Sequence, residues 1–171
     1  MERKIGFIGH REIYSLGLRE KLKKAIEEKL ERGYRFCTMG THGDFDELSL
    51  SVCRELREKF KDLKIEVVLT SYHLVEKKLI DTIKNKDGEV EFIYESYVPY
   101  NDVATIMYDI EDVFYKRKIL VSNQLMINAC DVLICYVNPK NNYSGAYYAY
   151  KYAKNKGLKI INLFNENNLK N

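Results

Sequence analysis

Three glycine-bearing turns carry the residues best suited to do chemistry in this chain. Gly9-His10-Arg11 follows the apolar segment Lys4–Ile8, Gly40-Thr41-His42-Gly43-Asp44 follows a second apolar segment, and Ser144-Gly145 precedes a helical pattern. A glycine at a strand end lets the backbone turn tightly, and the first turn of a following helix offers unpaired N–H groups. Histidine and arginine add further donors. The chemistry that these turns predict is the binding of a phosphate or a nucleotide.

The order of the elements places these turns together. Any one of them could arise from ordinary loop chemistry. In an open parallel sheet, however, the carboxyl ends of the strands share one edge, and ligands bind there. We therefore predict a ligand site at that edge, made of Gly9, His10, Arg11, Gly40, Thr41, His42, Gly43, Asp44, Asn123, Ser144 and Gly145.

Acid–base catalysis is a second use of the same region. The candidate catalytic residues are His42, Asp44 and Asp46, with His10 beside them, because imidazole and carboxyl groups can transfer protons and a carboxylate can hold a ribose hydroxyl. Asp44 is equally suited to cap the following helix, with Glu47 three residues on. A loop histidine commonly serves only as a hydrogen-bond partner. The sequence therefore leaves the catalytic residues unassigned.

Composition predicts one folded domain. The 171 residues are 46% hydrophobic with two prolines, and a chain of this length buries roughly 70% of its unfolded surface without a disulfide or a metal. The 28 basic and 25 acidic residues give a net charge of only +3. Because the charges alternate in sign along the predicted helices, nucleic acid is not the expected partner.

The four cysteines are predicted to be core thiols. Cys37, Cys53, Cys130 and Cys135 form no Cys-x-x-Cys motif and have no histidine at metal-ligand spacing, so we expect no metal site. No apolar leader precedes the first strand, and no apolar run reaches transmembrane length. These features predict a cytoplasmic protein without a membrane partner.

Strands and helices alternate along the first 70 residues. Apolar residues at helical spacing predict a helix over residues 15–32, ended by Gly33. A second helix is predicted from Asp44 to Phe60. The strands predicted between them are Tyr34–Met39 and Ile65–Leu69.

Residues 71–100 form a predicted insert, in which Leu74–Lys84 has the pattern of a short helix, Asn85–Gly88 that of a turn and Val90–Tyr94 that of a strand. After it, Asn101-Asp102 can cap a helix. The apolar positions of that predicted helix are three and four residues apart: Val103, Ile106, Met107, Ile110 and Phe114.

The C-terminal part completes an α/β pattern. Helical spacing resumes from Ile119 to Ile127, and Val132–Val137 is apolar throughout, as in a strand buried on both faces. A helix closed by Gly157 and a strand over Lys159–Phe164 follow. We predict a Rossmann-like three-layer sandwich with a mainly parallel central sheet, forming one domain over residues 1–171.

Four motifs carry a family resemblance. They are Phe7–Arg11, Met39–Asp46, Ser122–Val137 and Ser144–Ala146, and they span nearly the whole chain. Taken in this order, they resemble the SLOG superfamily, a Rossmann-like group that includes the DprA and Lonely Guy branches, and within it the YpsA-like branch. The resemblance implies a nucleotide or nucleotide-derived ligand. It supplies no reaction and no established cofactor.

The chain departs from these relatives in two motifs. Ser122-Asn123 stands where they commonly carry Arg-Asn, and Ser144-Gly145 stands where they carry Gly-Gly. Losing a guanidinium there would change anion affinity or ligand identity, with Arg117 as a candidate substitute. The Pro-Gly-Gly-x-Gly-Thr string of the Lonely Guy branch is absent, so we do not expect cleavage of nucleotide N-glycosides by that mechanism.

Two alternatives stay open beside simple nucleotide binding. A nucleotide hydrolase or transferase would use His42 with Asp44 or Asp46. A DprA-like binder of single-stranded DNA would need its lysines in one stripe, whereas here they are spread along the helices. Tyrosines near the expected site, which are Tyr136, Tyr143 and Tyr147, are candidates for base stacking. The last helix, rich in tyrosine and alanine, also predicts a homo-oligomer.

Overall fold

The computed structural model describes residues 2–71 and 76–165. The chain divides into two compact units, one formed by Met1–Thr70 with Val103–Asn171 and the other by Ser71–Asp102. Each unit is described by itself.

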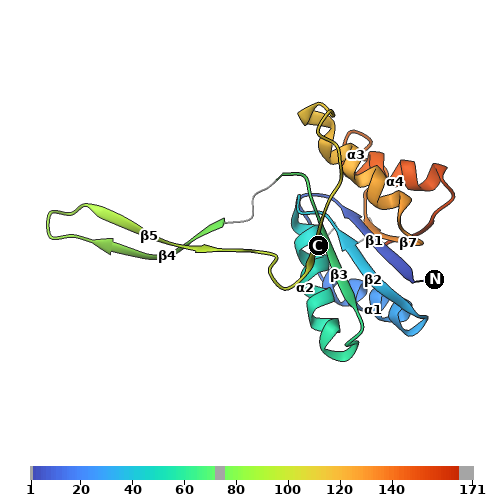
Figure 1. Cartoon of the computed structure of the whole chain (residues 1–171), viewed down its shortest axis with the longest axis horizontal. Coiled ribbons are helices and arrows are strands. Elements are labelled where there is room, and N and C mark those ends of the chain that lie inside the picture. Colours follow the sequence, from blue (N-terminus) through green and yellow to red (C-terminus); the bar gives the residue numbers. More distant parts are fainter. Residues whose placement is uncertain (1, 72–75, 166–171) are drawn as a thin grey trace. The chain divides into compact units, whose positions relative to one another are not determined.

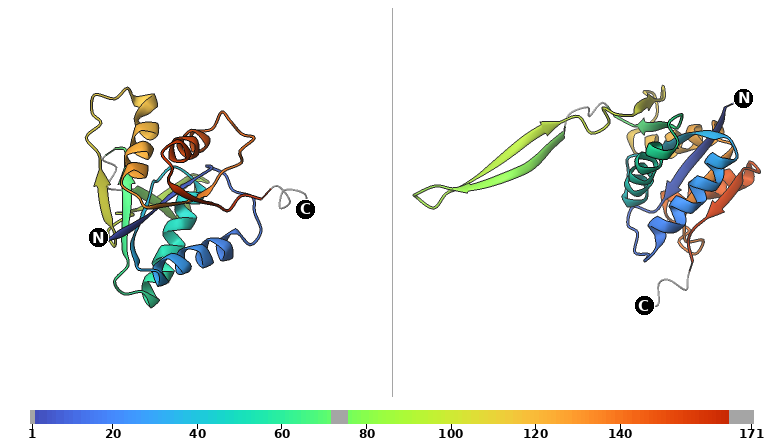
Figure 2. Two further views of the ribbon diagram at one scale, coloured as in Figure 1. Left: turned by 90° about the vertical axis from the view of Figure 1, so that its right-hand side faces the viewer. Right: turned by 90° about the horizontal axis from the view of Figure 1, so that it is seen from below.

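The larger unit is built around a six-stranded parallel sheet. Its strands are β1 (Arg3–Gly9), β2 (Tyr34–Met39), β3 (Lys64–Leu69), β6 (Ala104–Met107), β7 (Val132–Tyr136) and β8 (Lys159–Asn162), in the spatial order β6-β3-β2-β1-β7-β8. Its helices are α1 (Leu18–Glu31), α2 (Asp44–Lys59), α3 (Tyr115–Asn128) and α4 (Gly145–Asn155). Helices α1 and α2 cover one face of the sheet, and α3 and α4 cover the other (Figures 1 and 2). This confirms the predicted Rossmann-like sandwich.

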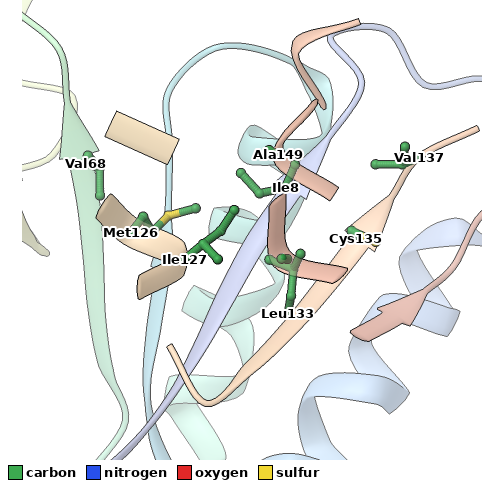
Figure 3. Close-up of a cluster of buried hydrophobic side chains, with 9 residues drawn as sticks. Ile8, Val68, Met126, Ile127, Leu133, Cys135, Val137 and Ala149 are labelled. Carbon is green, nitrogen blue, oxygen red and sulfur yellow. The ribbon is translucent and has the colours of Figure 1, made fainter. Parts of the chain in front are cut away.

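Alternation along the strands fills both layers of the core. Ile5 and Phe7 of β1 are fully buried on the face covered by α2, while Ile8 points to the opposite face. There Ile8 packs with Met126 of α3 and Leu133 of β7 (Figure 3). Burying each such side chain contributes about 1.5–3 kcal/mol. The periodic apolar pattern therefore stabilises the packing of the sheet against the helices on both of its faces.

Most of the predicted elements are confirmed, with small differences at their ends. The helix predicted over residues 15–32 begins only at Leu18, because Gly17 takes a positive φ of 74° as its N-cap. The strand predicted over Lys159–Phe164 ends at Asn162.

The helix predicted over Val103–Phe114 is wrong. Residues Ala104–Met107 instead form strand β6, which pairs in parallel with β3 from Glu66↔Ala104 to Leu69↔Met107. A short edge strand followed by a loop reproduces the same spacing of apolar residues, and the β-branched residues Thr105 and Ile106 favour the strand.

The smaller unit is a β-hairpin, and its first strand corrects a second prediction. Strand β4 (Glu76–Lys84) pairs antiparallel with β5 (Val90–Tyr97), so the helix predicted from Leu74 to Lys84 is wrong; its start lies outside the described residues. The turn between the strands is confirmed. The Asn85 side-chain oxygen accepts hydrogen bonds from the N–H groups of Asp87 and Glu89 at 3.1 and 2.9 Å, and Gly88 has a φ of 84°.

The cysteines lie in the larger unit. Cys37, Cys53 and Cys135 are buried, as predicted, whereas Cys130 is only half-buried, and none of the four cysteines forms a disulfide. Burial raises the pKa of both Cys130 and Cys135 to about 12, which keeps these thiols protonated at neutral pH. Within the described ranges, no helix has both the length and the apolar character needed to cross a bilayer.

Candidate functional site

The topology creates one position where strand order reverses. Strand β1 lies in the middle of the sheet, with β2 on one side and β7 on the other. The loops after the carboxyl ends of these three strands therefore surround the switch point between β1 and β7, which is where open α/β sheets bind ligands.

Hydrogen bonds hold these loops together. The N–H of Asp44 donates to the carbonyl of Arg11 at 2.7 Å, and the Asp44 carboxylate accepts from the N–H of Ile13 at 3.2 Å. On the other side, the N–H of Asn138 donates to Nε2 of His10 at 2.8 Å. The expectation that Asp44 caps its own helix is therefore wrong. Its side chain joins the loop after β2 to the loop after β1, and Gly43 is the N-cap.

A cavity of about 280 Å³ opens between these loops and the helices α3 and α4. This volume is close to the lower end for small-molecule sites, roughly 300 Å³. Of the predicted site residues, the structure brings seven predicted ligand-binding residues and Asp46 to its wall: Gly9, His10, Arg11, His42, Asp46, Asn123, Ser144 and Gly145. The remaining wall residues, Ile8, Ile119 and Ala146, were not predicted.

Four of the predicted site residues line neither this cavity nor the one beside it. They are Gly40, Thr41, Gly43 and Asp44. Two of the glycines instead allow close packing. A Cβ at Gly43 would lie 2.5 Å from Cα of Arg11, and a Cβ at Gly40 would lie 2.9 Å from the Asp46 carboxylate. These glycines shape the loops without facing the cavity.

The N-terminus of α4 supplies amide donors to the cavity. Ser144 is its N-cap and accepts a hydrogen bond from the N–H of Tyr147 at 3.0 Å. The next two N–H groups, those of Gly145 and Ala146, have no acceptor among the described residues. Unpaired amides at the positive end of a helix favour an anion. Helix α1 was expected to play this role, but it begins at Leu18, and its first turn lines neither cavity.

Arg11 adds a cation at the same place. Its side chain is exposed, and its guanidinium forms no hydrogen bond or ion pair with any residue that the structure describes. Its charge nevertheless acts inside the cavity. Burial lowers the pKa of the His42 imidazole most, and the Arg11 charge lowers it further. An unpaired guanidinium beside helix amides is a suitable partner for a phosphate or carboxylate.

The two histidines are held as neutral hydrogen-bonding groups. Nε2 of His10 accepts the Asn138 N–H, which leaves the ring proton on Nδ1, and burial lowers the pKa of this histidine. Nε2 of His42 lies 3.0 Å from the Thr70 hydroxyl. Neither imidazole is therefore a freely ionising group on the wall, and each is oriented by a partner outside the cavity.

Asp46 is the titratable carboxyl group of the cavity. Its Oδ2 accepts the N–H of His42 at 2.9 Å. Desolvation raises its pKa to about 6; Glu47 contributes a smaller rise, and the hydrogen bond from His42 opposes both. This carboxyl group can therefore accept or release a proton near neutral pH, or accept a hydrogen bond from a ligand hydroxyl.

A second cavity of about 390 Å³ adjoins the first and shares His10, Arg11 and Ser144 with it. Its aromatic wall consists of Tyr14, Tyr136 and Phe164, and its polar wall includes Glu12, Asn138 and Asn141. The rings of Tyr136 and Phe164 meet edge to face, with centroids 5.4 Å apart. Of the tyrosines predicted to lie near the site, Tyr136 lines this cavity, whereas Tyr143 and Tyr147 line neither.

The arrangement fits an anionic ligand with a planar ring. The first cavity offers amide and guanidinium donors, and the second offers aromatic rings with amide side chains beside them. Among the described residues, no group of three or more histidine, cysteine or acidic side chains is placed to hold a metal. Comparisons with known proteins gave no matching family model and no matching curated protein.

Proposed function

We propose that this protein binds a nucleotide or nucleotide-derived ligand at the carboxyl edge of its sheet. One observation carries the proposal. Arg11 and the unpaired amides of α4 lie beside an aromatic cavity at the topological switch point of the sheet. The phosphate would lie at Arg11 and Gly145, and the base would lie against Tyr14 and Phe164.

The family assignment belongs to the same proposal. The loops at the cavities carry the motifs that resemble the YpsA-like branch of the SLOG superfamily. A cytoplasmic location is also part of it, since four unpaired thiols suit a reducing compartment.

Native mass spectrometry of the purified protein, followed by calorimetry, tests the proposal. The titrated compounds are AMP, ribose 5-phosphate and adenosine. AMP alone carries both the phosphate and the base, so we expect it to bind more tightly than either of the other two. A panel of nucleotides in which none is retained and none binds would contradict the proposal.

Arg11→Ala should weaken the binding of a nucleotide monophosphate by about 1.5–3 kcal/mol, because a charge-assisted hydrogen bond to phosphate is lost. This corresponds to a roughly 10- to 150-fold rise in Kd. The matched control is Arg32→Ala, which removes an exposed arginine that lines neither cavity. Equal losses in the two variants would show that Arg11 has no special role.

A hydrolase or transferase is the second candidate function. The Asp46 carboxyl group favours it, since a pKa of about 6 suits proton transfer near neutral pH and the group lines the cavity with His42. Asp44, the third catalytic candidate, lies outside the cavity wall. Steady product formation from a nucleotide panel, lost in His42→Ala, would support this candidate. No turnover across the panel would remove it.

A further inference from the structure

The β4–β5 hairpin exposes an unusual amount of apolar surface. Ile93 is half-buried, while eight large apolar side chains are each at least 41% exposed: Leu79, Ile80, Ile83, Val90, Phe92, Tyr94, Tyr97 and the adjoining Val98. A two-stranded hairpin has at best marginal stability in water by itself. Exposed apolar surface of this extent marks a contact with another molecule. We refer to residues 76–97 as the arm.

The strand register separates the two faces of the arm by charge. Leu79↔Tyr94, Thr82↔Phe92 and Lys84↔Val90 are opposed pairs on one face, where the charged residues are Lys77 and Lys84. The other face carries Ile83, Ile93 and Tyr97 among four acidic residues and one lysine: Glu76, Asp81, Glu91, Glu95 and Lys78. Each face therefore combines apolar residues with charge of one predominant sign.

The charge balance of the whole chain indicates what covers the arm. Residues 71–102 contain four basic and seven acidic residues, a net charge of −3. The rest of the chain keeps 24 basic and 18 acidic residues, a net charge of +6. The acidic face of the arm, with Glu76, Asp81, Glu91 and Glu95 against Lys78, is repelled by nucleic acid and by anionic membrane surfaces. It is complementary to a basic protein surface, and the larger unit of this same protein is one.

We propose that the acidic face of the arm, which carries Glu91 and Glu95, binds the larger unit of a second copy of this chain, so that two chains exchange arms in a two-fold dimer. Symmetric stacking of one arm on the other is disfavoured, because each face would then meet its own sign of charge. This inference is independent of the proposed ligand. It rests on the exposed apolar side chains of the arm and on the opposite net charges of the two units.

Sedimentation velocity over a concentration series tests the dimer. We expect a species of twice the 20.2 kDa chain mass that dissociates as salt is raised. Glu91→Lys with Glu95→Lys should weaken the dimer about tenfold or more, because the arm loses its negative charge. The matched control is Glu20→Lys with Glu28→Lys, which changes the net charge equally on the exposed side of α1 and should not weaken association.

A second arm variant tests the apolar contact. Ile83→Ser with Tyr97→Ser removes two exposed apolar side chains from the face that carries Glu91 and Glu95, and it should also weaken the dimer about tenfold or more. The circular dichroism spectrum and thermal midpoint of the larger unit should stay as in the wild type. A wild-type chain that is monomeric at about 100 μM overturns the proposal. So does a dimer that both arm variants leave unchanged, since another surface, such as the tyrosine-rich face of α4, would then hold it.

Discussion

Gly9→Ala is expected to destabilise the fold by about 3 kcal/mol or more. A Cβ at this position would lie 2.3–2.5 Å from three carbon atoms of the Phe45 side chain, which is completely buried. A shift of the Phe45 ring away from the new methyl group would disturb its stacking on Tyr136, whose ring centroid lies 6.2 Å away. The backbone of Gly9 is also fixed by its pairing with Tyr136 in the sheet. Urea denaturation measures the change in the free energy of unfolding.

Two further variants show whether the Phe45 contact is the cause. Gly9→Ala should cost less stability in a Phe45→Ala background than in the wild type, since alanine lacks the Cγ and Cδ1 atoms that lie nearest to the new Cβ and the two changes are therefore not additive. Gly145→Ala is the matched control, because a Cβ there meets no atom within 4 Å. It should change stability by less than about 0.5 kcal/mol. A loss from Gly9→Ala that is the same with or without Phe45 would contradict this explanation.

This role of Gly9 could not be predicted from the sequence. Sequence reasoning assigned the glycine to a tight turn, yet its φ lies outside the positive region that favours glycine, and what it permits is the contact with Phe45. The two residues are 36 positions apart. A single sequence shows that a residue is small but does not show which distant side chain needs the space.

The fold was largely predictable because its signals are local. Uninterrupted apolar runs such as Val132–Tyr136 and helical spacing in α1 and α2 each identify one element, and their alternation determines the layers. The prediction failed where spacing alone is ambiguous. Residues 103–107 satisfy a helical pattern, and only pairing with β3, some 40 residues earlier, makes them a strand.

The site was predictable to the level of its loops. The rule that ligands bind at the carboxyl edge brings Arg11, His42 and Ser144 together correctly. It gives no information on Tyr14, which lies in an irregular segment, or on Phe164, which was predicted to end a strand and instead lies in the irregular segment after β8. The aromatic cavity is therefore a property of the folded chain that loop motifs do not encode.

Asp46 should make the stability of the protein depend on pH. Its pKa is about 6 in the folded state against 3.8 for an unperturbed side chain. Between these values the folded protein binds more protons than the unfolded chain, so the free energy of unfolding falls as pH rises. Integrated over this window, the loss attributable to Asp46 is at most about 3 kcal/mol, and it is complete above the folded-state pKa.

Asp46→Asn should remove this part of the pH dependence. The amide oxygen of asparagine can still accept the His42 N–H, and asparagine has no proton to lose. We therefore expect the variant to match the wild type near pH 4 and to exceed its stability at pH 7, as measured by urea denaturation at both values. Asp44 lies outside the cavity wall, so Asp44→Asn should keep the wild-type difference in stability between pH 4 and pH 7. If the free energy of unfolding changes with pH by the same amount in the wild type and in Asp46→Asn, the Asp46 carboxyl group ionises in the folded protein at no cost. The cavity would then lack the desolvated acid on which proton transfer to a ligand depends.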